Sequence, residues 1–409
     1  MTAVLPAAPA PEDVPRVARV LAHESDAGFV DLLELSLREA QARARADLDP
    51  ALLAALPWPS TFREYLGFLV EFARWIPQES SDPAWSDPGT PEHQEVYDRL
   101  CHFYWLIDQP VGPYGQVVQD VGWFSDWLVE YADTWGEFLD TTDSFDDDIL
   151  RTFLEDSPKY RVQDSLVDGR PNNPSGWLTF NQFFARELNP GLRPVDEPGT
   201  NTTAVAPADC TYKQHYAIDA DSGIPAITIK GTHTYANVRD LLAGSRYADA
   251  FAGGHFIHFF LGPYSYHRFH APVSGTVEEC YPVRGKVYLK VQLAQHQFQA
   301  YDASQGAYEF AQARGVLTID TTRSPHGDVG IVAVVPVGMC QVSGVTMTHT
   351  PGAPCLKGDE FGYFTFGGSD IIVLLQKGAH PRYNPAFSDP NPPYSLVGTP
   401  IATLVERPR

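Results

Sequence analysis

The sequence predicts an α+β protein in which a helical N-terminal domain precedes a β-rich domain. Between about residues 27 and 140, apolar side chains recur at the three- and four-residue spacing of amphipathic helices. Beyond about residue 200 they form short runs separated by Gly and Pro, which is typical of strands joined by turns. With 409 residues, of which 44% are hydrophobic, the chain is long enough for two or three domains with substantial cores.

The helical half contains a well-marked helix start at Thr61. Thr61 and Glu64 have the spacing of a capping box, apolar side chains then follow one helical face, and Pro77 ends the pattern. Two further aromatic-rich helices are expected at residues 95–107 and 117–138. We interpret their Trp and Phe side chains mainly as core, with the lining of a substrate pocket as the alternative.

The domain boundaries follow from composition. Residues 1–22 are rich in Pro and Ala and are expected to be disordered, so that the helical domain spans 23–165. A Pro-, Asn- and Gly-rich passage at 168–176 leads into the second domain, which spans 175–409. The strands expected there lie at residues 226–229, 255–261, 286–293, 330–337 and 371–375.

The formal net charge of −22 restricts the choice of partners. Nucleic acid is not expected, because phosphate binding depends on clustered Lys and Arg. Stable membrane association is also disfavoured, because anionic lipid attracts basic rather than acidic surfaces. A small cationic or zwitterionic partner meets no such repulsion, and the alternative is that the charge only maintains solubility.

Compartment and cofactor expectations come from the cysteines and from the N-terminal residues. The five cysteines are widely scattered and form no CxxC pair, which favours a reducing compartment and argues against a structural zinc site. The N-terminal residues lack a secretory signal, and no apolar run is long enough to span a membrane. We therefore expect a cytoplasmic protein.

An acid, an imidazole and a hydroxyl occur in the order Asp209, His267 and Ser369. An activated oxygen nucleophile needs this set, because the imidazole takes the hydroxyl proton and the carboxylate orients the imidazole. Order alone is weak evidence, since such triads occur in every order and any long chain contains these residue types. The alternative is that FGGSD, at residues 366–370, forms only a turn before the strand at 371–375.

Two pairs of histidines have a three-residue spacing. His267 and His270 would share one face of a helix, where they could bind a metal. Nearby Pro and Gly favour a strand or turn, in which the two rings point apart, and no third ligand is evident. We therefore expect no metal, and we interpret His255 and His258 as packed imidazoles.

Five segments in order resemble the phosphatidylserine decarboxylase family. They are residues 180–188 (FNQFFAREL) with the Pro-Gly and Arg-Pro pairs that follow, 206–209, 230–231, 266–272 with Gly275, and 357–369. The helical half, including DTWGEF at 133–138, resembles the extra domain of a soluble branch that includes fungal L-tryptophan decarboxylases. The resemblance implies the β-rich decarboxylase domain of that family.

The resemblance also implies a self-cleaving zymogen. Family members cut themselves at a Gly-Ser bond, which here is Gly368–Ser369 and gives chains 1–368 and 369–409. Ser369 would become a covalent pyruvoyl group, the electron sink for decarboxylation, without pyridoxal phosphate or metal. His267, oriented by Asp209, is the expected base and later the proton donor, and His270 is expected to line the pocket or support the imidazole.

The chain departs from the family pattern at two positions. Ser265 stands where many members carry Asp, so any supporting charge there is lost. Asp370 follows the nucleophile, where Thr or Ser is usual, and its charge could either slow cleavage or assist it.

Three functions remain as alternatives. The favoured one is decarboxylation of a free amino acid, with an aromatic one such as L-tryptophan preferred because of the branch resemblance. The second is phosphatidylserine decarboxylation to phosphatidylethanolamine, which the acidic charge disfavours. The third is a non-catalytic, unprocessed relative that serves as a binding module. The expected partners are the amino acid and the two cleaved chains, and a homo-oligomer remains open.

Overall fold

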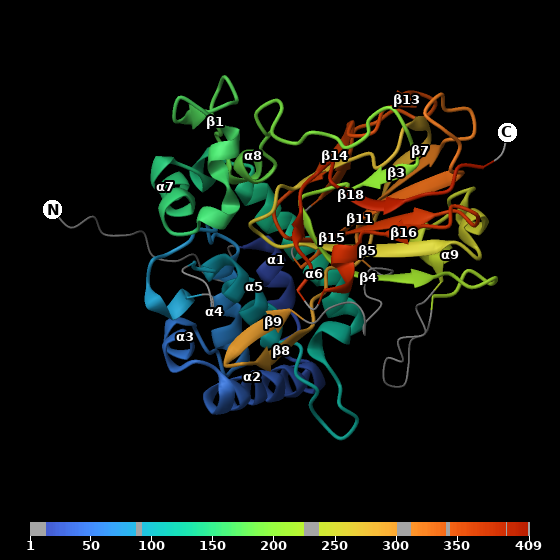
Figure 1. Cartoon of the computed structure of the whole chain (residues 1–409). Helices are drawn as coiled ribbons and strands as arrows, with labels where there is room; N and C mark the ends of the chain where they lie inside the picture. Colours follow the sequence, from blue (N-terminus) through green and yellow to red (C-terminus); the bar gives the residue numbers. More distant parts are fainter. Residues whose placement is uncertain are drawn as a thin grey trace. The chain divides into compact units, whose positions relative to one another are not determined.

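The computed structural model describes residues 14–86, 92–224, 237–300, 312–340, 344–389 and 391–407. Contacts divide the chain into two compact units. Unit 1 consists of residues 1–158 and 286–301, and unit 2 consists of residues 159–285 and 302–409. The long helices belong to the N-terminal part of the chain and most strands to the C-terminal part, as the colours of Figure 1 show. The α+β prediction is therefore confirmed.

Unit 1 is built from helices whose aromatic side chains fill its core. The helices are α1 (Pro15–Leu21), α2 (Ala27–Asp47), α3 (Pro50–Ala55), α4 (Phe62–Phe72), α5 (Glu95–Trp105), α6 (Gly122–Leu139) and α7 (Asp147–Glu155). The capping box at Thr61 starts α4 as predicted, and α5 and α6 lie within the other two expected helical regions. Trp105, Trp127 and Trp135 are fully buried, so the interpretation of these aromatics as core holds.

Part of the segment expected to be disordered is helical. In α1, Val17 and Val20 are fully buried, and the indole Nε1 of Trp127 donates a 2.7 Å hydrogen bond to the Arg16 carbonyl. The three-residue spacing of these valines gives even this short helix an apolar side to pack against α6. Residues 1–13 lie outside the described part of the chain.

A strand expected in the second domain, at residues 286–293, overlaps a hairpin that belongs to unit 1. Strands β8 (Val291–Ala294) and β9 (Gln297–Ala300) pair with each other, and Phe298 packs against Trp105 with ring centroids 5.9 Å apart. Val287, Leu289 and Val291 of the expected strand are buried, and β8 pairs with β9 and is not a strand of the large sheet. The strand expected at 226–229 and the motif at 230–231 fall outside the described residues.

Unit 2 is organised around an eight-stranded antiparallel sheet of order β13-β7-β10-β11-β15-β5-β4-β17. Its strands are β4 (Cys210–Ala217), β5 (His255–Leu261), β7 (Gly275–Val283), β10 (Arg314–Asp320), β11 (Ile331–Met339), β13 (Pro354–Cys355), β15 (Gly368–Leu375) and β17 (Tyr394–Ser395). The strands predicted at 255–261, 330–337 and 371–375 are confirmed as β5, β11 and β15. One face of the sheet carries an apolar cluster that includes Phe256, Val335, Ile372 and Leu374.

Smaller elements complete unit 2. They are α8 (Phe180–Phe184), α9 (Val238–Leu241), the pair β1 (Leu166–Val167) and β2 (Arg170–Pro171), the sheet of β12 (Val345–Met347), β14 (Glu360–Phe364) and β6 (Arg268–His270), and the sheet of β16 (Arg382–Tyr383), β18 (Pro400–Thr403) and β3 (Thr203–Val205). Strand β6 carries His270, and α9 contributes Val238 and Leu241 to the apolar cluster of the large sheet.

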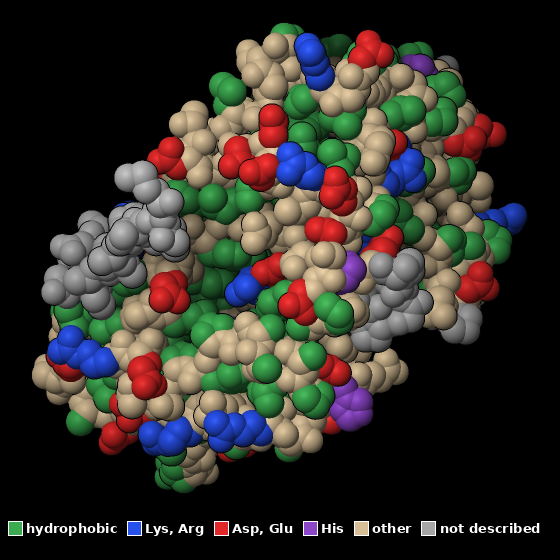
Figure 2. Space-filling view, turned by 90° about the vertical axis from the view of Figure 1, so that its left-hand side faces the viewer, with side chains coloured by type: hydrophobic (Ala, Val, Ile, Leu, Met, Phe, Trp, Pro, Cys, Tyr) green, Lys and Arg blue, Asp and Glu red, His purple; other side chains and the backbone are tan. Residues whose placement is uncertain are grey.

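The surface of the protein carries charged side chains of both signs (Figure 2). On the face drawn in Figure 2, Asp and Glu side chains lie among the Lys and Arg side chains. Within the described ranges, no helix combines the length and the apolar character that crossing a bilayer requires.

Candidate active site

Ser369 lies at the start of the central strand β15. It stands opposite Gly338 of β11 and Leu261 of β5, and its side chain is fully buried. Gly367, just before the strand, has φ of 151°, a conformation that glycine adopts more easily than other residues. The two glycines thus turn the chain into a rigidly paired strand, and the serine is the second residue of that strand.

Asp370 faces the side of the sheet opposite to Ser369. The pairing of β15 runs without a bulge, so neighbouring side chains alternate between the two faces. Asp370 shares its face with Ile372, and its Oδ2 lies 3.2 Å from Nε2 of the buried His258. The position that departs from the family pattern therefore directs its charge away from the serine hydroxyl.

His267 lies beside the segment that leads into the Gly368–Ser369 bond. Its ring stacks on Phe184 of α8 at 3.8 Å between centroids, and Phe184 also packs edge-on against Phe366 at 5.0 Å. The amide of Phe364 donates a 3.0 Å hydrogen bond to the His267 carbonyl. These contacts join His267, α8 and the end of β14 into one aromatic cluster.

The motif at residues 180–188 fixes the same segment. Asn181 of α8 is buried, and its Oδ1 accepts a 2.9 Å hydrogen bond from the backbone amide of Phe366. The helix itself is capped by Thr179, whose hydroxyl accepts from the Gln182 amide. Residues 180–188 thus hold the backbone two residues before the Gly368–Ser369 bond, a role that the sequence alone did not disclose.

The environment of His267 keeps its imidazole neutral. The side chain is fully buried, and burial lowers the pKa of His267 well below its ordinary value. The positive charge of Arg186 lowers this pKa further, while a backbone group of Ser265 opposes the shift. Among the described residues, the two ring nitrogens and the Ser369 hydroxyl have no well-formed hydrogen bond.

Asp209 is not paired with His267, contrary to the expectation from the sequence. Its carboxylate accepts hydrogen bonds from Nε and Nη2 of Arg193, at 2.9 Å and 2.5 Å, and from the Val397 amide at 2.8 Å. The planar guanidinium group matches the geometry of a carboxylate. Arg193 is therefore the partner of Asp209 that the sequence analysis expected His267 to be. Arg193 is also bound by Asp164.

His270 points away from His267, as expected for a strand. Its Nδ1 is 2.9 Å from the Gly358 carbonyl, and its Nε2 is 3.2 Å from the hydroxyl of Tyr266. Burial lowers the pKa of His270, while the charges of Glu360 and Asp209 oppose this. Both ring nitrogens of His270 thus have partners other than His267.

A cavity of about 250 Å³ opens on the His270 side. Its lining consists of Glu187, Leu188, Asn189, Gly191, Arg193, Tyr266, His270 and Glu360. Neither Ser369 nor His267 is part of that lining. The structure thus brings His267 close to the segment before the Gly368–Ser369 bond. His270 and Arg193, which binds Asp209, line a separate polar cavity.

Ser265, the other departure from the family pattern, is buried and engaged. Its hydroxyl accepts a 2.8 Å hydrogen bond from the hydroxyl of Tyr394 on β17. Burial raises the pKa of Tyr394, which keeps the phenol neutral. The neutral hydroxyl of Ser265 suits this neutral partner.

Comparison with known proteins relates this site to one family. A family model described as phosphatidylserine decarboxylase matches residues 180–388, just over half of the 409 residues. Phosphatidylserine decarboxylase proenzyme 2 of Oryza sativa subsp. japonica is 28% identical over 328 residues, which cover 76% of this chain and 48% of that protein. Phosphatidylserine decarboxylase proenzyme 2 of Komagataella phaffii is 33% identical over 204 residues, which cover 49% of this chain and 18% of that protein.

A third relative has a different name. Decarboxylase iboD of Amanita muscaria is 29% identical over 266 residues, which cover 59% of this chain and 74% of that protein. The chain spans less than half the length of the rice and Komagataella proteins, and most of the length of this third relative.

Proposed function

The chain belongs to the phosphatidylserine decarboxylase family, and from this premise we propose that it is a proenzyme that cleaves itself between Gly368 and Ser369 and then decarboxylates a free amino acid. The observation that carries the proposal is the position of Ser369. The serine is buried at the head of the central strand, directly after a glycine turn and inside the family match.

The first step uses residues of this chain only. The Ser369 hydroxyl attacks the Gly368 carbonyl, and the peptide nitrogen is released as the acyl group moves to oxygen. His267 is the proposed acceptor of the hydroxyl proton, supported by its place in the aromatic cluster and by the neutral state that burial imposes. Elimination of the resulting ester frees chain 1–368, and hydrolysis with loss of ammonia leaves a ketone at residue 369.

The surroundings of Ser369 fit a pyruvoyl group. The serine hydroxyl and the His267 nitrogens are buried polar atoms without a well-formed hydrogen bond among the described residues, so a reacting carbonyl would meet unused polar atoms there. The backbone from residue 369 onward is paired on both sides, which would hold a new chain end in place. Such a group supplies a ketone that binds a substrate amine and withdraws electrons as carbon dioxide leaves.

The other site residues have distinct proposed roles. His267 would return a proton to the α-carbon of the substrate. Asp209 would hold the loop at Val397, and Arg193, bound to Asp209, would hold the wall of the polar cavity. This structural role replaces the orientation of His267 that was expected for Asp209. His270 lines that cavity and is proposed to support it through Tyr266 and the Gly358 carbonyl.

A free amino acid is the favoured substrate class for two reasons. The net charge of −22 disfavours docking on anionic lipid, and a zwitterion meets no such barrier. The Amanita muscaria relative, which is matched over 74% of its own length, is named a decarboxylase without reference to phosphatidylserine. The preference for an aromatic amino acid such as tryptophan rests on the branch resemblance, because the aromatic side chains of unit 1 are core. We place the enzyme in the cytoplasm on the same compositional grounds.

Phosphatidylserine is the second candidate substrate, since two of the relatives described above are named phosphatidylserine decarboxylase proenzymes. The two candidates are separated by measuring carbon dioxide release from a panel of free amino acids and from phosphatidylserine liposomes. Turnover of a free amino acid without lipid supports the proposal. Turnover with liposomes alone would replace it by the second candidate, and release from neither by a fully cleaved protein would contradict both.

A further inference from the structure

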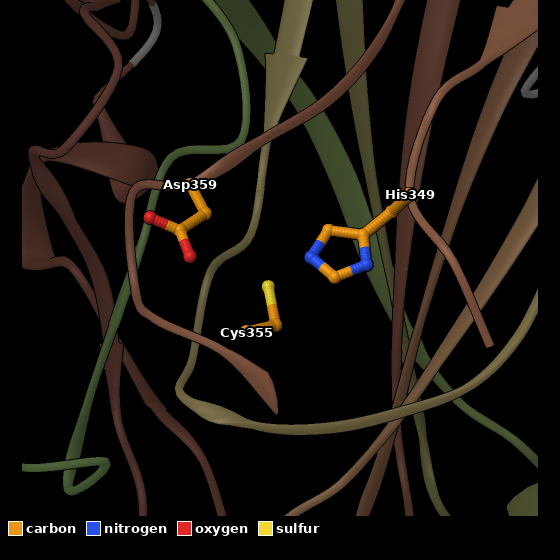
Figure 3. Close-up of side chains that lie close together, drawn as sticks. All are labelled: His349, Cys355 and Asp359. Carbon is orange, nitrogen blue, oxygen red and sulfur yellow. The ribbon is translucent and has the colours of Figure 1, made fainter. Parts of the chain in front are cut away.

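A cluster of three different metal-binding side chains lies outside the site described above. His349, Cys355 and Asp359 lie between β12 and β14, and one ligand atom of each lies within 4.8 Å of the others. Figure 3 shows the imidazole, the thiol and the carboxylate directed toward a common space. The sequence did not indicate this group, because the three residues match no familiar metal-binding spacing and Cys355 has no partner cysteine in a CxxC pair.

The backbone fixes this cluster without help from a ligand. Cys355 belongs to β13 and pairs with Gly275 of β7. The turn before it is tied to the same strand, since Gly352 donates a hydrogen bond to the Val277 carbonyl and Val277 donates one to the Ala353 carbonyl. The cysteine is therefore held in a sheet, and a ligand would not have to order it.

The three side chains differ in their exposure to solvent. Cys355 is buried, His349 is half-buried and Asp359 is exposed, so an ion can enter from the carboxylate side. The Leu356 amide donates a 2.7 Å hydrogen bond to Oδ2 of Asp359, which leaves Oδ1 for an ion. The Cys355 thiol donates only a long 3.6 Å contact to the Leu356 carbonyl, which a metal can displace.

The donor set favours one kind of ion. Thiolate, imidazole and carboxylate together suit Zn²⁺, whereas Ca²⁺ and Mg²⁺ prefer oxygen ligands alone. Zinc bond lengths of about 2.0–2.3 Å place tetrahedral ligand atoms about 3.3–3.8 Å apart. Small side-chain rotations bring atoms within 4.8 Å to that spacing, and three protein ligands leave the fourth position to water or to another donor.

We propose that His349, Cys355 and Asp359 form a zinc-binding site with one open coordination position. The site adjoins the backbone that holds His270. The Gly358 amide donates to the Ala271 carbonyl, the Ala271 amide donates to the Asp359 carbonyl, and the Gly358 carbonyl lies against the His270 ring. A bound ion would link His349 to Asp359 across the segment that leads into β14.

The test is zinc binding by the whole protein, purified without a histidine tag and stripped with a chelator. Titration with zinc against a chromophoric competitor should show one site per chain. Cobalt titration should give a thiolate charge-transfer band and the visible bands of tetrahedral Co²⁺. Cys355→Ala should abolish the charge-transfer band, and Asp359→Asn and His349→Ala should each weaken zinc binding at least about tenfold.

Cys101→Ala is the matched control, because it removes a buried thiol in unit 1 and should leave the affinity unchanged. A measurement on the native protein covers the case in which a variant misfolds: zinc should slow alkylation of Cys355 by a thiol reagent, located by peptide mass spectrometry. Absence of binding at micromolar zinc, undiminished affinity in both Asp359→Asn and His349→Ala, or unchanged alkylation of Cys355 would each overturn the proposal.

Discussion

Along β15, consecutive side chains meet different surroundings, and this decides what each residue can do. Ser369 faces away from the apolar cluster, whereas Asp370 faces into it and pairs with His258. The sequence left open whether the charge of Asp370 would slow cleavage or assist it. The alternation along the strand indicates that it does neither directly.

Replacing these neighbours should therefore give opposite results. Ser369→Ala should yield one uncut chain without decarboxylase activity, because no nucleophile remains. Asp370→Asn should still cleave, with a rate within about threefold of the parent, and should lose about 1–3 kcal/mol of stability through its buried histidine partner. Denaturing electrophoresis and thermal unfolding measure both effects. A folded Asp370→Asn protein that stays uncut would contradict this assignment.

The pH dependence of self-cleavage follows from His267. Burial lowers the pKa of His267, so the neutral form that accepts a proton persists below the pH at which an exposed histidine would become charged. The cleavage rate of newly synthesised precursor should therefore stay nearly constant from about pH 8 to about pH 6. The measurement is a time course of chain 1–368 in buffers of constant ionic strength. A rate that falls by half near pH 6.5 would indicate a base with an ordinary pKa.

At the scale of elements, α8 holds the segment that leads to the proposed cleavage site at Gly368–Ser369. Asn181→Ala removes the acceptor for the buried Phe366 amide, so we expect cleavage to slow about tenfold, equivalent to ~1.4 kcal/mol. Gln182→Ala is the control within the same helix, because Gln182 contacts the Leu178 amide near the exposed helix start. Its cleavage should stay near the parent rate. If cleavage slowed equally in both variants, the cause would be general destabilisation of α8 and not the loss of the hydrogen bond to Phe366.

Elements differ in how far the sequence predicts them. The α4 helix and the β5 strand were predicted because the capping box at Thr61 and the apolar run at 255–261 are local signals. The helix α1 was missed, and the strand at 286–293 was expected in the second domain, because α1 and the β8–β9 hairpin are stabilised by packing against helices distant in the sequence. Periodicity carries no information about such contacts.

In the candidate site too, the sequence predicts some residues and not the contacts between them. Ser369 and His267 came from ordered motifs, and the structure places His267 beside the backbone that precedes the serine. The Arg193–Asp209 pair and the role of Asn181 depend on side-chain geometry that no spacing reveals. The Asp209–His267 expectation failed for that reason.

At the scale of the whole molecule, cleavage should not separate the two chains. Chain 369–409 would contribute β15, β16, β17 and β18, and β15 lies between two strands of chain 1–368 in the middle of the large sheet. Native size-exclusion chromatography should therefore show one species that contains both chains, and denaturant should be needed to part them. Elution of free chain 369–409 in native buffer would contradict this account.

The intact mass of the purified protein tests the central claim most directly. The account predicts two chains, 1–368 and 369–409, with the smaller one lighter than its sequence by one ammonia and reactive toward a carbonyl reagent. A single full-length chain, or a small chain that begins with an unmodified serine, would contradict it.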